Sequence, residues 1–337
     1  MAEPHPPVVR YRVGMTRRHA HLFDVEATFP AGAEVLSVSL PVWTPGSYLV
    51  REYARHLQDV TATTAEGRPL AVRRKDKRTF DIDAHGEAVT LRYRVYANEL
   101  SVRTSHLDGS HAYINGATLF LSPERLRRAE HRVRFDAPEG WRTFVALERD
   151  RERAEFVAKD YDELVDSPFE LGPHTALQFN AAGVEHQVVV WGEPSPDRER
   201  LTSDLRKIVE TEARLFGGLP REMKRYVFFI YLTDKGRGGL EHAASTALLY
   251  PRFALGNGRG WEDFLSLAAH EYFHLWNVKR IVPKALVPFD YSQESYTTLL
   301  WAFEGGTSYY DNLMVRRAGL MAPQRYLTRF GETLTAL

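Results

Sequence analysis

The chain has 337 residues, enough for two domains, because a single hydrophobic core rarely grows past roughly 250–300 residues. Hydrophobic residues make up 44% and charged residues 26% of it, as in ordinary soluble globular proteins. Basic and acidic residues number 44 each, so the basic excess typical of nucleic-acid-binding proteins is missing, and the lack of cysteine excludes disulfides and thiolate metal ligands.

The sequence predicts neither a membrane span nor a secretory signal. It contains no run of 18 or more apolar residues, and its first residues have no apolar core of the kind that a signal peptide needs. We therefore expect a cytoplasmic protein, although a processed periplasmic protein would have the same features. The sequence does not predict the oligomeric state.

The first half of the chain has the pattern of short β-strands. Polar and apolar residues alternate over five segments, and turn-forming Gly, Pro, Asp and Asn lie between them. These segments are Val8–Val13, His21–Phe29, Val35–Leu40, Val89–Tyr96 and His131–Phe135. Many short strands at such spacing predict a β-sandwich-like domain over residues 1–183.

The second half, residues 184–337, has a mixed α/β pattern. Short apolar strands are expected at Val188–Trp191 and Val227–Leu232, with a helix over Arg198–Phe216 between them and an extended edge segment over Gly239–Tyr250. From Trp261 onward the pattern is helical, with a break around Pro283–Asp290. The first of these helices has acids in its expected first turn and Lys279-Arg280 in its last turn, which suits the helix dipole.

Residues 270–274 read His-Glu-Tyr-Phe-His, the H-E-x-x-H pattern of zinc hydrolases. Residues four apart lie on the same face of a helix, so the imidazoles of His270 and His274 can bind one Zn²⁺ ion. Glu271, one residue on, is placed to accept a proton from a water at the metal. A buried His–Glu pair that makes only structural hydrogen bonds is the alternative, but two histidines and an acid in an almost wholly apolar helix favour the metal.

A catalytic zinc needs a third protein ligand, here a His or a carboxylate. Glu304 is the best candidate, because it is a lone acid in an apolar and small-residue stretch; Asp311 is a more polar second choice. The adjacent pair Gly305-Gly306 would let this stretch approach the histidine helix closely, or it would end one helix and begin another.

Several segments resemble the glycyl aminopeptidase family of the glutamate-zincin metallopeptidases. The resemblance rests first on HEYFHLWNVKRI (His270–Ile281) and WAFEGGTSYY (Trp301–Tyr310). It extends to LPVWTPGSYLVREYARHLQDV (Leu40–Val60), YDELVDSPFELG (Tyr161–Gly172) and GGLEHAAST (Gly238–Thr246).

The resemblance implies a β domain followed by a thermolysin-like catalytic domain that removes N-terminal residues, often Gly or Ala, from peptides with a free N-terminus. It implies that His270, His274 and Glu304 bind the zinc and that Glu271 is the general base. In GGLEH, it implies that Glu241, beside Gly239, binds the α-amino group of the substrate. Members of this family usually continue with more helices and a PDZ domain, so residues 184–337 are expected to be an incomplete catalytic domain.

Three assignments stay open from the sequence. Tyr309 or Tyr310 can donate to the reaction's oxyanion or belong to the core, and His242 can assist Glu241 or be a strand residue. Trp43, in a Trp-Thr-Pro-Gly turn, can line a cleft or form a packed corner. Two other functions also stay open: an endopeptidase on the same site, and a peptide-binding module that holds zinc without turnover.

Overall fold

A computed structural model describes residues 6–193 and 196–336. The chain divides into two compact units, an N-terminal unit (Met1–Pro173 with Phe289–Ser295) and a C-terminal unit (His174–Pro288 with Tyr296–Leu337). Among the described residues, no helix combines the length and the apolar character that crossing a membrane requires.

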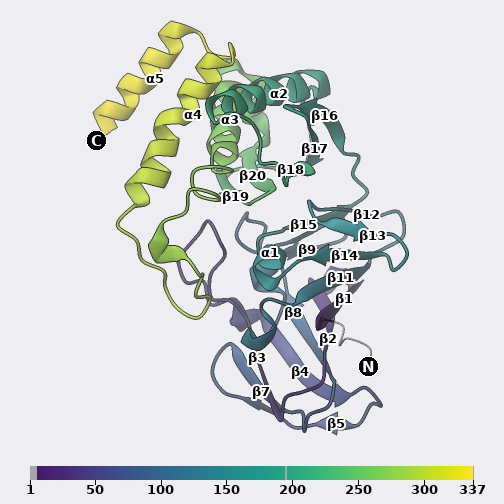
Figure 1. The fold of residues 1–337 in the computed structure, drawn as a ribbon. Helices are drawn as coiled ribbons and strands as arrows, with labels where there is room; N and C mark the ends of the chain where they lie inside the picture. Colours follow the sequence, from purple (N-terminus) through teal and green to yellow (C-terminus); the bar gives the residue numbers. More distant parts are fainter. Residues whose placement is uncertain (1–5, 194–195, 337) are drawn as a thin grey trace. The chain divides into compact units, whose positions relative to one another are not determined.

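The N-terminal unit is β-rich and contains three sheets around one apolar core (Figure 1). The largest has eight strands in the order β13-β14-β11-β1-β2-β8-β4-β5, in which only the pair β1–β11 is parallel. Its strands are β1 (Val8–Arg17), β2 (Leu22–Phe29), β4 (Leu57–Thr64), β5 (Pro69–Leu70), β8 (Val89–Tyr96), β11 (Glu130–Asp136), β13 (Glu148–Asp150) and β14 (Glu155–Ala158).

Two smaller sheets complete this unit. The four-stranded sheet has the order β12-β15-β10-β9, and the three-stranded sheet has the order β3-β7-β6. Their strands are β3 (Val35–Ser39), β6 (Val72–Arg74), β7 (Thr79–Asp83), β9 (His106–Leu107), β10 (Ala112–Ile114), β12 (Arg142–Phe144) and β15 (Phe169–Gly172), and a short helix α1 covers Tyr161–Val165. Short 3₁₀ helices lie at Arg18–Ala20, Tyr53–His56, Gly116–Thr118 and Glu124–Leu126.

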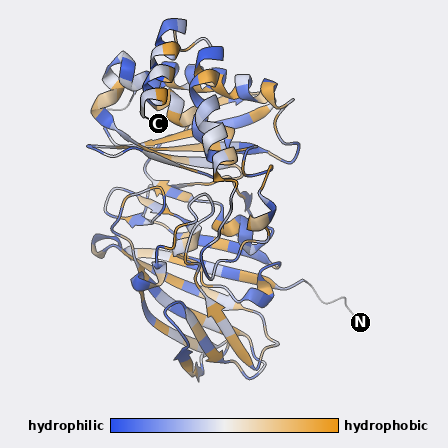
Figure 2. Ribbon diagram, turned by 90° about the vertical axis from the view of Figure 1, so that its left-hand side faces the viewer, coloured by the Kyte–Doolittle hydropathy of each residue, from blue (hydrophilic) through white to orange (hydrophobic). Residues whose placement is uncertain are grey.

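Alternation along the strands explains why these segments form sheets with one buried face. In β2 and β8 every second side chain is buried, and Figure 2 shows hydrophobic and hydrophilic residues alternating along the strands. The five strands predicted from this pattern are all present, and the β-sandwich-like class expected for the first half of the chain is confirmed.

The C-terminal unit has a five-stranded mixed sheet with the order β16-β17-β18-β20-β19. The pairs β17–β18 and β18–β20 are parallel, and both edge strands are antiparallel. The strands are β16 (Leu177–Ala181), β17 (Val184–Trp191), β18 (Arg225–Thr233), β19 (Gly238–Glu241) and β20 (Ser245–Pro251). The central strand β18 is buried at seven consecutive positions, as expected for a parallel strand covered on both faces.

Helices pack on this sheet and share its core (Figure 1). They are α2 (Arg198–Leu215), α3 (Gly258–Phe273), α4 (Gly306–Arg317) and α5 (Pro323–Ala336), with 3₁₀ turns at Arg252–Gly256 and Lys284–Leu286 and a π-helical turn at Trp301–Gly305 that runs into α4. Helix α3 contacts α2, α4, β19 and β20, so it lies at the centre of the unit. The expected mixed α/β, thermolysin-like class is confirmed.

Two predicted boundaries in this unit were wrong. Helix α3 begins at Gly258, where the Asn257 side chain accepts a hydrogen bond from the Gly260 amide, and it ends at Phe273 rather than near Arg280. Because the helix begins at Gly258, the two acids at 262–263 lie after its first turn. After Phe273, irregular hydrogen-bonded turns continue to Ile281. The predicted edge segment over 239–250 is a hairpin, because its chain reverses between β19 and β20 and only β19 is at the edge.

The division of the chain into domains at residues 1–183 and 184–337 stays a prediction. By contacts alone, the N-terminal unit ends at Pro173 and regains a short segment, Phe289–Ser295. Trp43 explains why that segment belongs there. Its indole N–H donates to the carbonyl oxygens of Asp290 and Gln293, each at 2.9 Å, and the ring is fully buried, so Trp43 forms a packed corner.

Buried histidines make acid sensitivity a testable property of both units. Burial lowers the pKa of His131, in the N-terminal unit, and of His186, in the C-terminal unit, to about 4. Between pH 6.5 and pH 4 the unfolded chain therefore binds more protons than the folded chain at these positions, so stability falls as the pH falls.

For His131 we expect the free energy of unfolding to fall by roughly 2 kcal/mol between pH 7 and pH 5. Urea unfolding of the metal-free chain at both pH values measures it. The variant His131→Gln should lose less stability over this interval than the wild type, whereas the exposed-site control His19→Gln should behave like the wild type. Equal losses in His131→Gln and the wild type would contradict the prediction.

Candidate metal centre

The two histidines of the H-E-x-x-H pattern lie one helical turn apart at the end of α3. His270 is in the last turn of α3, and His274 directly follows the helix but keeps a right-handed helical backbone. Their ring centroids are 4.7 Å apart, with the rings nearly perpendicular. His274 is buried, and the side chain of His270 is only 17% exposed, so both rings are largely shielded from solvent.

Glu304 comes from the π-helical turn Trp301–Gly305 and meets both rings. Its Oε2 lies 3.4 Å from His270 Nε2 and 3.7 Å from His274 Nε2. Zinc binds nitrogen and oxygen ligands at about 2.0–2.2 Å in a tetrahedral arrangement, which places the ligand atoms roughly 3.3–3.6 Å from each other. The three side chains therefore have the donor types and the separations that a zinc ion requires.

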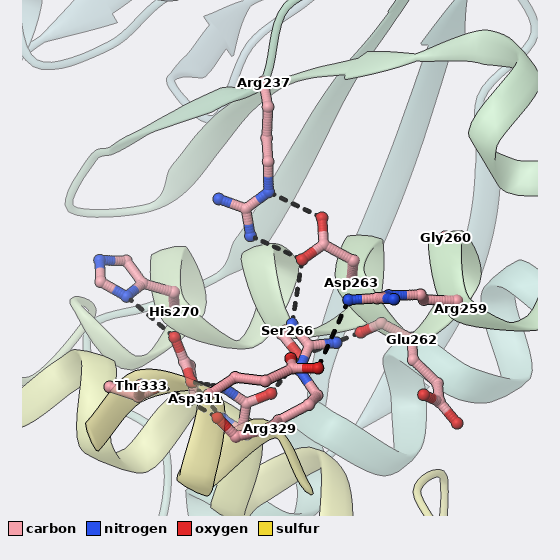
Figure 3. Close-up of polar contacts among 12 residues, drawn as sticks. Arg237, Arg259, Gly260, Glu262, Asp263, Ser266, His270, Asp311, Arg329 and Thr333 are labelled. Atoms are coloured by element: carbon pink, nitrogen blue, oxygen red, sulfur yellow. Dashed lines mark hydrogen bonds and ion pairs between the residues drawn. The ribbon is translucent and has the colours of Figure 1, made fainter. Parts of the chain in front are cut away.

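The outer nitrogens of both rings are held by hydrogen-bond partners. His270 Nδ1 faces the Asp311 carboxylate of α4 at 3.5 Å, as Figure 3 shows, and His274 Nδ1 lies 2.7 Å from the carbonyl oxygen of Asn277. An acceptor at Nδ1 keeps the proton there and directs Nε2 toward a metal, which is the usual arrangement for metal-binding histidines. Asp311 is thus placed behind His270, whereas Glu304 is the carboxylate that meets both Nε2 atoms.

The surroundings of His270 favour a positive charge. Burial by itself lowers the pKa of this ring, but its hydrogen bonds to Asp311 and Glu304 outweigh burial and raise the pKa to about 10. Glu212 of α2 lies near the same groups, and burial raises its pKa well above the usual value. The site therefore concentrates acidic side chains around two imidazoles, a setting that suits a cation.

Asn277 joins the two segments that carry the candidate metal-binding side chains. Its amide nitrogen lies 3.2 Å from the Ala302 carbonyl oxygen and 3.2 Å from Thr307 Oγ1, on either side of Glu304. Its own carbonyl oxygen is the partner of His274. One residue therefore fixes the ring of one candidate ligand and the backbone that carries another.

Glu271 points to the other side of the site, toward the edge strand β19. Ligand atoms of Glu241, Glu271 and His274 all lie within 4.8 Å of one another, and all three side chains are buried. A methyl group added to Gly239 would overlap the carboxyl group of Glu271, so only glycine allows β19 to approach the helix this closely. Oε1 of Glu241 has no hydrogen-bond partner among residues 6–193 and 196–336, although it is buried.

An arginine–carboxylate network lies on α3 two turns before His270 (Figure 3). Asp263 accepts hydrogen bonds from Arg237, just before β19, at 2.8 Å and from Arg329 of α5 at 3.0 Å. The network ties the start of the edge strand and the last helix to α3. It thereby supports the position of β19 beside Glu271.

The remaining sequence candidates lie around these groups. Tyr309 is half exposed and packs edge-on against Tyr310, which stacks on Phe273. His242 is buried in the turn between β19 and β20. Gly306 begins α4 directly after the π-helical turn, close to the Asn277 side chain, so the glycine pair both marks a helix junction and lies where the two segments approach.

Sequence reasoning missed Glu212 and Asn277. Glu212 occupies the apolar face of α2 with Leu201, Leu205 and Ile208, and an acid at such a position was a readable signal. Asn277 gave no signal, because its partners are 25 to 30 residues further along the chain.

Loss of the Asn277 amide should loosen the candidate metal site. In Asn277→Ala the backbone around Glu304 loses its link to the histidine segment, so we expect zinc affinity to fall about tenfold or more, as for other groups that orient metal ligands. Competition with a chromophoric chelator measures this. The control Ser266→Ala removes a different bond between α3 and α4, to Asn312, and should keep wild-type affinity. Equal affinities in Asn277→Ala and the control would contradict the assigned role.

Two models of one peptidase family match segments of this chain. The model of the peptidase M61 N-terminal domain matches residues 10–173, and that of M61 glycyl aminopeptidase matches residues 263–337. No curated protein gives a significant match.

Several solved structures are also similar to this chain. An aminopeptidase N family protein from Idiomarina loihiensis is 36% identical, with a TM-score of 0.91 over 95% of this chain. The present chain spans 56% of the length of that protein. Two structures of a mutant M1 zinc metallopeptidase from Deinococcus radiodurans, one with a Tyr-Ser-Ala substrate, are 12% and 13% identical to this chain. Each has a TM-score of 0.57 over 98% of this chain and 75% of its own length, so they share the fold.

The matches at both ends of the chain, together with the close structural relative, confirm the resemblance noted from the sequence: the chain belongs to the M61 glycyl aminopeptidase family.

Proposed function

We propose that this chain carries the active site of a zinc aminopeptidase that removes the N-terminal residue from peptides. The observation that supports this most is the adjacency of two groups of side chains. His270, His274 and Glu304 form one group, and Glu241 and Glu271 adjoin it through His274. A metal, a proton acceptor and an anchor for an ammonium group are what such a hydrolase requires.

In this proposal one zinc ion binds to His270, His274 and Glu304. When bound, zinc supplies Lewis-acid chemistry, because it polarises a carbonyl group and makes water more acidic. The ligand separations of 3.4 and 3.7 Å and the acceptors behind both rings support the assignment. The distant structural neighbours are themselves described as zinc metallopeptidases.

Glu271 acts as the general base. Its carboxylate takes a proton from the attacking water and later gives it to the leaving amine, so the group ends the cycle as it began. Burial and the close approach of Gly239 restrict its motion, which keeps the carboxylate near His274.

Glu241 binds the α-ammonium group of the substrate. A buried carboxylate oxygen without a hydrogen-bond partner among the described residues is unfavourable by itself, and an ammonium group would satisfy it with a charge-assisted hydrogen bond. The edge position of β19 leaves one side of this strand for pairing with an extended peptide. Family membership supports substrates that begin with Gly or Ala.

Replacing the base should separate metal binding from turnover. Glu271→Gln keeps the size of the side chain but cannot accept the proton, so we expect zinc to stay bound while kcat falls at least 10³-fold. The matched control Glu262→Gln alters an acid of the same helix that pairs with Arg325, and it should retain activity. Wild-type turnover by Glu271→Gln would refute the role of this residue.

Substrate charge tests the ammonium anchor. Wild-type kcat/KM should be at least 100-fold higher for a free Gly- or Ala-initiated peptide than for its N-acetylated form, and Glu241→Gln should lower the value for the free peptide toward that of the acetylated one. Equal cleavage of both forms by the wild type would indicate an endopeptidase instead. Zinc binding without cleavage of either form would indicate a peptide-binding module.

A further inference from the structure

The hairpin formed by β9 and β10 in the N-terminal unit carries a second compact group of metal-binding side chains. Its sequence, Ser105-His106-Leu107-Asp108-Gly109-Ser110-His111, places two imidazoles and one carboxylate within six residues. We propose that His106, Asp108 and His111 form a metal site for a zinc-class divalent cation, separate from the candidate centre in the C-terminal unit.

Strand geometry explains why the three side chains share one face. In the hairpin Leu107 pairs with Ala112 and His106 pairs with Tyr113, and the Asp108 amide donates to the His111 carbonyl oxygen at 3.1 Å. Residues two apart on a strand point to the same side, and directly paired residues point to the same side as each other. His106, Asp108 and His111 therefore project from one face of the hairpin.

The distances suit one small cation. Ligand atoms of the three side chains all lie within 4.8 Å of one another. His106 Nε2 is 3.2 Å from Asp108 Oδ2, and the two imidazole rings have centroids 5.0 Å apart. Nitrogen and oxygen ligands of a tetrahedral zinc ion are roughly 3.3 Å apart, so a cation can replace the direct contact between His106 and Asp108 with little movement. Water would complete the coordination.

Neighbouring groups already orient two of these side chains. The Ser110 and His111 amides donate to Asp108 Oδ1 at 2.7 and 3.1 Å, which fixes that carboxylate in the turn. His111 Nδ1 lies 2.9 Å from Oε1 of Glu170, which reaches it because Glu170 pairs with Tyr113 in the sheet. A carboxylate at Nδ1 directs Nε2 toward a metal, as in established zinc sites.

Burial distinguishes the two histidines of this group from surface residues. His111 and Glu170 are almost fully buried, and His106 is 9% exposed. Nδ1 of His106 is buried, yet it has no hydrogen-bond partner in the described part of the chain. The contacts within the cluster therefore leave Nδ1 of this ring unsatisfied. Rotation of the ring would allow either nitrogen of His106 to bind a cation.

The role that follows is structural. β9 has two residues and is the last strand of the four-stranded sheet; on its other side, among the described residues, it has only an isolated bridge from His106 to Asn98, a hydrogen bond from the Leu107 amide to the Ala97 carbonyl oxygen, and a contact of the Leu107 carbonyl oxygen with His21 Nδ1. A cation bound by both strands of the hairpin would tie this edge to β10 and, through His111 and Glu170, to β15. This site would stabilise the N-terminal unit and would not depend on the proposed peptidase activity.

Metal stoichiometry of the full chain tests the proposal. After removal of metal with EDTA, titration with Zn²⁺ and with Co²⁺ should give two equivalents for the wild type. The double variant His270→Ala/His274→Ala, which lacks the C-terminal centre, should give one. Adding Asp108→Asn to that variant should weaken the remaining site at least tenfold, while the control His85→Asn, at an exposed position of the same unit, should not change it.

Asn has the shape of Asp, and its side-chain oxygen can accept the same turn hydrogen bonds, so we expect Asp108→Asn to fold like the parent variant. Circular dichroism checks this. Zinc should also raise the melting temperature of the double variant, and by less once Asp108→Asn is added. No binding by the double variant, or unchanged affinity with Asp108→Asn, would overturn the proposal. Neither result would bear on the C-terminal centre, because the metal bound there is measured as the difference between the wild type and the double variant.

Discussion

The C-terminal unit gathers carboxylates around the end of α3, and their negative charge requires compensation by a cation. Glu241 and Glu271 are buried side by side, and Glu304 and Asp311 face the two imidazoles at the end of α3. Removing a carboxylate from water costs several kcal/mol unless an opposite charge or several hydrogen bonds replace the lost solvation. In the proposed function, a metal ion at the imidazoles and an ammonium group at Glu241 would together supply that charge.

The backbone holds these groups in place from several directions. Asn277 links the chain after α3 to the π-helical turn of Glu304, and the Asp263 network links the approach to β19 and helix α5 to α3. Gly239 lets the edge strand come close enough for Glu241 to reach the same site. A site assembled from separate segments of chain needs such ties, because small displacements of ligands or base cost much of the catalytic rate.

Local pattern was enough to predict the parts of the fold and site that depend on near neighbours. The spacing of His270 and His274 predicted that both rings share one helix face, and the lone acid Glu304 was identified by its apolar setting. Features set by distant partners were not predictable. The place of Asp311 behind His270 and the amide bonds of Asn277 depend on residues brought together only by folding. The hairpin residues His106 and His111 were overlooked although they are near neighbours in sequence, because strand pairing rather than their spacing places them on one face with Asp108.

In the proposed function, one metal ion binds where His270, His274 and Glu304 converge. Anomalous X-ray diffraction at the zinc absorption edge, on crystals of the zinc-loaded chain, tests it most directly. We expect an anomalous peak within coordination distance of both Nε2 atoms and of a Glu304 oxygen. A peak bound by other residues, or a Glu304 side chain turned away from an occupied histidine pair, would contradict it.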